Sequence, residues 1–123
     1  MSYEEAMVPR TVPANADLSA YARRFVAINS SGKLVLNTTA GARCYGVLYD
    51  KPAAVDRAAC VIVGGVVPVV ASATIQPGDK IASTNDGRAA VATTGQHYMG
   101  IAKEGGASGA FIPVDLSVQG VAA

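Results

Sequence analysis

Beyond residue 17, the sequence alternates short apolar runs with turns that contain glycine. The runs are RRFVAIN, KLVLN, CYGVLYD, ACVIVGGVVPVVAS, KIAST, RAAVA, QHYMGIAK and AFIPVDLS. Short strands that recur about every eight to twelve residues are typical of β-sandwiches and small barrels. No helical stripe of apolar residues competes with this pattern. We therefore predict an all-β fold, a small single-domain β-barrel or sandwich of short strands over residues 18–117.

Glycine and proline positions add detail to this pattern. Ser30-Ser31-Gly32 separates the first two runs and predicts a hairpin there. Gly64-Gly65 divides the most apolar run, which is therefore either a hairpin or one sharply bent strand. Because proline cannot donate to a sheet, Pro68 indicates an edge strand, a bulge or a strand start.

The two ends of the chain differ from the middle. Residues 1–17 contain Pro9 and Pro13 and show neither a helical nor an alternating pattern. Since each proline also pushes the preceding residue toward extended conformations, we expect an extended N-terminal arm outside the layers of the domain. Such an arm is either a disordered terminus or a segment that orders on a partner. Residues 118–123, VQGVAA, are predicted to be a loose C-terminal tail.

Residues 75–91, IQPGDKIASTNDGRAAV, contain two glycine-centred turns. A phosphate-binding loop would have to lead into a helix, but a β-prone run follows the first turn and a second turn follows that run. We therefore interpret both turns as bends of a sheet, with scaffold roles for Gly78, Asp79, Asp86 and Gly87.

The composition favours a partner chain. Half of the 123 residues are apolar and 15% are charged, which is below the roughly 25% that is usual in soluble domains. Some apolar surface is therefore expected to be covered by another chain. The net charge of +1 comes from mixed acidic and basic residues, which argues against nucleic-acid binding. No apolar run is long enough for a membrane helix, and the first residues do not resemble a signal peptide.

The sequence offers little for catalysis. His97 is the only histidine, and the two cysteines, Cys44 and Cys60, are far apart in the sequence. No nucleophile motif and no metal-ligand spacing is present. A Cys44–Cys60 disulfide is possible, but two cysteines also suit a reducing cytoplasm. We predict that the protein is not an enzyme, with no catalytic residues, no metal site and no cofactor.

From Tyr45 to Leu116, the order of motifs resembles a known family. A YGVL strand is followed by GGVVPVVA, by I-x-x-GD-x-I in IQPGDKI and by a DGRA turn; MGIA, KEGGASGA and FIPVDL complete the series. This series is similar to the small capsid decoration, or head cement, proteins of tailed bacteriophages. The resemblance implies a compact β-domain, commonly a homotrimer, on the outer surface of the mature capsid.

The resemblance also implies a function. A protein of this kind is made in the host cytoplasm, binds the major capsid protein and stabilises the shell by bridging its subunits. The arm is then the expected contact with the capsid, through the residues Tyr3, Val8, Pro9, Val12, Pro13, Leu18 and Tyr21. The alternatives are a tail or baseplate structural subunit and a small β-barrel module that binds a ligand.

Overall fold

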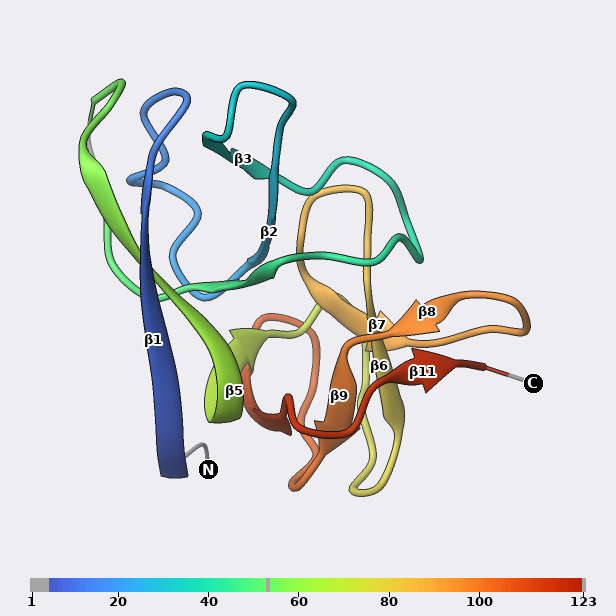
Figure 1. The fold of residues 1–123 in the computed structure, drawn as a ribbon. Coiled ribbons are helices and arrows are strands. Elements are labelled where there is room, and N and C mark those ends of the chain that lie inside the picture. Colours follow the sequence, from blue (N-terminus) through green and yellow to red (C-terminus); the bar gives the residue numbers. More distant parts are fainter. Residues whose placement is uncertain (1–4, 53, 123) are drawn as a thin grey trace.

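The computed structural model describes residues 5–52 and 54–122, and all their regular structure is β-strand (Figure 1). The strands are β1 (Glu5–Pro13), β2 (Phe25–Ile28), β3 (Leu34–Leu36), β4 (Gly46–Leu48), β5 (Ala58–Val70), β6 (Lys80–Ser83), β7 (Ala89–Val91), β8 (His97–Tyr98), β9 (Gly100–Ala102), β10 (Phe111–Asp115) and β11 (Gly120–Val121). The prediction of a small all-β domain is confirmed.

Nine strands form one curled antiparallel sheet in the order β3-β2-β4-β5-β10-β9-β6-β7, with β1 paired to β5. The remaining strands, β8 and β11, form a separate two-stranded sheet. Near the end of β5 the main sheet curls back on itself, because the amide of Ser72 donates to the carbonyl of Ala89 on β7 at 2.9 Å. The arrangement is a half-barrel (Figure 1).

The long strand β5 joins the two halves of this sheet. Ile62 pairs with Pro9 of β1 and with Val47 of β4, so these two strands lie on opposite edges of β5. Val66 pairs with Asp115 of β10, on the same edge as β4. Of the two possibilities for the Gly64-Gly65 run, the structure shows one bent strand, with a φ of 80° at Gly65.

Apolar side chains are buried on both faces of the sheet. Alternation along β2, β4 and β5 sends neighbouring residues to opposite faces. The larger core, inside the half-barrel, includes Phe25, Val47, Ile62, Val67, Val69, Ile75, Ile81, Met99, Ile112 and Val114. The smaller core, under the segment that joins β1 to β2, consists of Val12, Ala14, Leu18, Val26, Leu34, Leu48, Ala59 and Val61.

The expected arm and the expected tail both need correction. The chain from Glu5 to Pro13 is extended, but it is a strand of the main sheet and not an arm outside the domain. Its pairing with β5 satisfies the backbone groups that a free arm would leave to water. At the other end, Gly120 and Val121 pair with Tyr98 and His97, so this part of the chain is not a loose tail.

Pro68 lies within β5 although it has no N–H to donate, and its pairing with β10 explains why this is tolerated. Pro68 lies opposite Pro113 of β10 in a pair that exchanges no hydrogen bond. The nitrogen of Pro68 therefore faces the other edge of β5, beyond the end of β1, where no ladder donor is needed. The expectation of an edge position is met at this residue, although β5 is central elsewhere.

Candidate interaction surfaces

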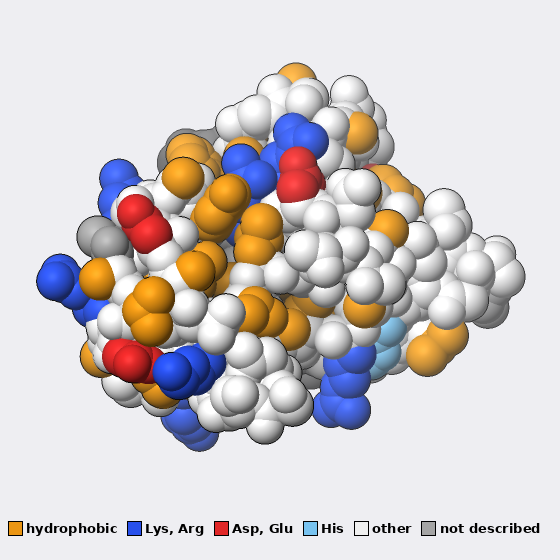
Figure 2. All heavy atoms as spheres, turned by 90° about the horizontal axis from the view of Figure 1, so that it is seen from above, with side chains coloured by type: hydrophobic (Ala, Val, Ile, Leu, Met, Phe, Trp, Pro, Cys, Tyr) orange, Lys and Arg blue, Asp and Glu red, His pale blue; other side chains and the backbone are white. Residues whose placement is uncertain are grey.

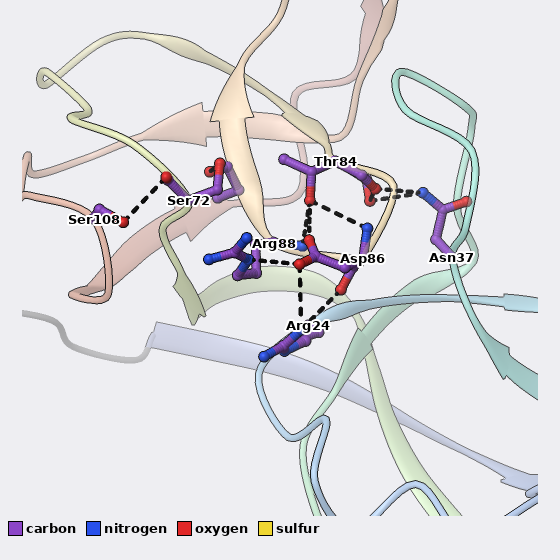
Figure 3. Close-up of polar contacts among 9 residues, drawn as sticks. Arg24, Asn37, Ser72, Thr84, Asp86, Arg88 and Ser108 are labelled. Atoms are coloured by element: carbon purple, nitrogen blue, oxygen red, sulfur yellow. Dashed lines mark hydrogen bonds and ion pairs between the residues drawn. The ribbon is translucent and has the colours of Figure 1, made fainter.

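The turn between β6 and β7 is fixed by a charged network around Asp86 (Figure 3). Arg88 Nε donates to Asp86 Oδ2 at 2.9 Å, and the hydroxyl of Thr84 donates to Oδ1. Arg24, just before β2, donates from Nη1 to the carbonyl of Asp86 at 3.1 Å and lies 3.8 Å from its carboxylate. The network thus ties this turn to the opposite half of the sheet.

These partners lower the pKa of Asp86 to about 2, mainly through the hydrogen bond from Arg88 and then that from Thr84. The carboxylate is therefore charged whenever the folded protein is above that pH. Its interactions stabilise the fold fully above about pH 3.8, the ordinary value, and this contribution is lost as the pH falls toward 2.

We expect Asp86→Asn to lower the free energy of unfolding at neutral pH by about 1 kcal/mol, since a partly exposed side chain is screened by solvent. The difference from the wild type should shrink through the window between pH 3.8 and 2 and vanish below it. Urea unfolding at a series of pH values measures this. A difference that stays constant across the window would contradict the assignment.

The other turn residues also hold the scaffold together. The carboxylate of Asp79 accepts the amide hydrogen of Gln76 at 2.8 Å, which closes the turn at Gly78 ahead of β6. Asn37, buried beside the second turn, donates to Ser83 Oγ at 2.7 Å and to the carbonyl of Thr84 at 3.2 Å (Figure 3). Both turns lead into strands, so neither offers the helix start that a phosphate-binding loop needs.

The outer edge of β1 is poor in hydrogen-bond donors. The amide of Ala14 bonds to Arg57, so by alternation the backbone groups of Pro9, Thr11 and Pro13 face outward. Two of these three residues lack an N–H, and the side chain of Arg10 donates to the carbonyl of Pro9 at 2.8 Å. This edge is thus protected against the addition of another strand.

The seven residues predicted to contact the capsid do not share one environment. Val8, Pro9 and Pro13 are exposed on β1, and Tyr21 is half-buried against the smaller core. Two others need correction: Val12 and Leu18 are 6% and 4% exposed, because they fill that core, and they cannot reach a partner. Tyr3 lies outside the described residues.

An open groove of about 480 Å³ lies between β2, the segment before β4, β5 and the segment before β11. It is lined by Ala27, Ile28, Arg43, Cys44, Tyr45, Val63 and Gln119. Ile28 and Tyr45 are 42% and 36% exposed, high values for large apolar side chains. Sequence reasoning missed this groove, since its residues come from four separate segments and carry no shared motif.

Other exposed apolar side chains are spread over the surface. They are Val8, Val55, Val91, Phe111, Val118 and Val121. Figure 2, which looks down on the β2–β3 end of the molecule, shows hydrophobic side chains gathered in the middle of that face, with Lys and Arg mostly around its rim. Such a distribution is typical of a protein that contacts other chains.

The two cysteines and the one histidine that the sequence singled out all lie within the described residues. Cys44 and Cys60 are both free, and burial raises the pKa of the Cys44 thiol to about 11, which makes it a poor nucleophile. His97 is half-buried on β8, with Nε2 3.5 Å from Gln119 Oε1. Within residues 5–52 and 54–122, no three potential ligands gather to hold a metal ion, and no helix could span a membrane.

The geometry therefore defines a curled antiparallel β-domain with a protected β1 edge, an open groove of mixed polarity and several exposed apolar side chains. Comparison of the sequence with protein-family models and with curated proteins finds no match. Among solved structures, the chain is similar to the N base of head fiber gp8.5 of bacteriophage phi29, with a TM-score of 0.69 and 19% sequence identity. The likeness covers 89% of this chain and 93% of that one, which shows a shared fold.

Proposed function

We propose that this chain is a structural protein of a phage virion that binds the outer surface of the mature capsid. It stabilises the shell by bridging subunits of the major capsid protein. The observation that carries the proposal is the fold, shared over nearly the whole chain with the base of a phage head fiber. The motif series from Tyr45 to Leu116 points to the same class of virion protein.

The exposed side chains of the domain support a binding role. A low content of charge leaves apolar side chains exposed, and each contributes about 25 cal/mol per Å² of apolar area when a partner covers it. As a homotrimer, the protein would add three such contacts through effective concentration. We place the shell contact on the exposed side chains of β1, Val8, Pro9 and Pro13.

The test is cosedimentation of the purified protein with expanded capsids from which it has been stripped. We expect saturable binding at a fixed ratio to the major capsid protein. Absence of binding by the folded protein would overturn the proposal. Binding to purified tails instead would identify a tail subunit, and a thermal shift with a small molecule would favour a ligand-binding module.

Substitution of Val8 tests the β1 contact. Val8 is 37% exposed, so Val8→Asp should leave the fold intact and weaken capsid binding about tenfold, because it puts a charge into an apolar contact. Val91→Asp is the matched control, since Val91 is 45% exposed on β7, away from β1. Equal binding by the two variants would remove β1 from the contact.

A further inference from the structure

Among the strand edges of the described chain, that of β11 carries neither prolines nor a bond to a neighbouring segment. The β1 edge is short of donors, as described above. At β3, the carbonyl of Leu34 accepts the amide of Asn15 at 2.9 Å, and at β7 the carbonyl of Ala89 accepts the amide of Ser72 at 2.9 Å. In contrast, β11 has a neighbour, β8, on one side, and no strand of the described chain pairs with its other side.

The backbone of β11 can accept another strand. Ala122 bonds to the turn just before β8: its amide donates to the carbonyl of Gln96 at 2.8 Å, and its carbonyl accepts from the amide of Gly95 at 2.9 Å. By alternation, the N–H and C=O groups of Val121 face away from β8. Val121 is 65% exposed and lies in a segment that contains no proline, so its edge is not protected as that of β1 is.

The open edge of β11 leads into the groove described above. Gln119, two residues before Val121, lines the groove. An extended segment paired along β11 would therefore continue past Gln119 toward Ile28, Tyr45 and Val63. Backbone pairing that supplies affinity, combined with a pocket that selects a side chain, is a common mode of peptide recognition.

The positive charge of Arg43 in the groove favours a ligand that carries an acidic residue. Arg43 is the one charged residue of its lining, and no acidic side chain of the described residues pairs with it. A carboxylate brought next to this exposed guanidinium would gain a charge-assisted hydrogen bond. The fitting ligand is thus an extended segment with an apolar side chain beside an acidic residue.

The chain itself contains such a segment, at its N-terminus. Residues 1–5, MSYEE, hold two of the nine acidic residues and no basic one, so the remaining chain has ten basic residues against seven acidic ones. No proline occurs before Pro9, and Tyr3 supplies an apolar ring next to Glu4. β1 begins at Glu5, and Figure 1 shows this end of β1 on the other side of the molecule from β11.

We propose that residues 1–4 of a second copy of this chain bind along β11, with Tyr3 in the groove and Glu4 beside Arg43. The contact joins two different surfaces, the N-terminal segment of one copy and the groove of the next. Contacts of this head-to-tail kind close into rings when the rotation between copies allows it. The proposal does not depend on capsid binding, and it leaves the exposed side chains of β1 free for the shell.

Sedimentation velocity of the purified full chain over a range of concentrations tests the proposal. Self-association should be present in the wild type and lost on deletion of residues 1–4. Arg43→Glu and Glu4→Lys should each raise the dissociation constant about tenfold, because each turns an attraction into a repulsion. The double variant, which reverses both charges, should recover wild-type association.

Arg57→Glu is the matched control, since Arg57 is exposed just before β5 and lies outside the groove lining. It makes the same change of charge and should associate as the wild type does. Unchanged melting temperatures show that the variants are folded. A monomeric wild type, unchanged association after deletion of residues 1–4, equal behaviour of the two arginine variants, or no recovery in the double variant would each overturn the proposal.

Discussion

A chain that lacks residues 1–13 should fail to fold, whereas deletion of residues 1–4 alone should change the free energy of unfolding by less than about 1 kcal/mol. The reason is that β1 pairs with β5 from Glu5↔Val66 to Pro13↔Ala58. Its removal would expose one whole edge of the strand that joins the two halves of the sheet. It would also open the smaller core, where Val12 is buried.

The expected loss exceeds the stability of an ordinary domain. Burial of one valine contributes about 1.5–3 kcal/mol, and each backbone hydrogen bond contributes a net ~0.5–1.5 kcal/mol. Several such bonds disappear with β1, from a total stability that is roughly 5–15 kcal/mol in most domains. Circular dichroism during heating measures the result. A cooperative transition within a few degrees of that of the full chain would show that β1 is dispensable.

Gly87→Ala should destabilise the fold by about 3 kcal/mol, and Gly78→Ala by only about 1 kcal/mol. Both glycines are in the left-handed region, with φ values of 79° and 87°, so both variants share the strain of an alanine there. They differ in their surroundings. A Cβ on Gly87 would lie 2.7 Å from Leu36 Cδ1 and 2.8 Å from the carbonyl oxygen of Phe25, while a Cβ on Gly78 would meet nothing within 4 Å.

The contact at Gly87 cannot be relieved by a small movement of the turn. The carbonyl of Gly87 accepts the amide hydrogen of Phe25 at 2.7 Å, and Phe25 is fully buried in the larger core. Displacing the turn would therefore break this bond and disturb the network around Asp86. Urea unfolding of the two variants, side by side, separates strain from steric conflict. Equal losses of unfolding free energy in the two variants would mean that the chain around Gly87 moves to accommodate the Cβ without a further loss of stability.

The sequence predicted the strands whose signals are local. The hairpin around Ser30-Ser31-Gly32 and the strands on either side of the Asp86-Gly87 turn are confirmed, because each depends on residues close together in the chain. For the Gly64-Gly65 run the sequence left a hairpin and a bent strand open, and the structure shows the bent strand. The place of β1 in the sheet was not predictable in this way. Its partner is distant in sequence, and Pro9 and Pro13 suggested a free arm until the pairing showed that both face outward.

The groove was less predictable than the fold. Arg43 and Tyr45 lie in a loop without any motif before β4, and Ile28 ends β2, whose first residues, Phe25 and Val26, are buried. Only the curvature of the sheet brings these side chains together with Gln119, which is far along the chain. A pattern of exposed and buried positions within one strand contains no information on which residues of other strands lie beside it.

The pairing of β1 with β5 also sets the order of events during synthesis. Val12 pairs with Ala59, so β1 leaves the ribosome long before its partner strand exists. In that interval its apolar residues are available to other nascent chains. Pro9 and Pro13 lower the risk that β1 pairs with another chain during this interval, since a strand with few N–H donors is a poor template for aggregation. The fold can close only once β5 has emerged, which makes folding of this small domain slow and late.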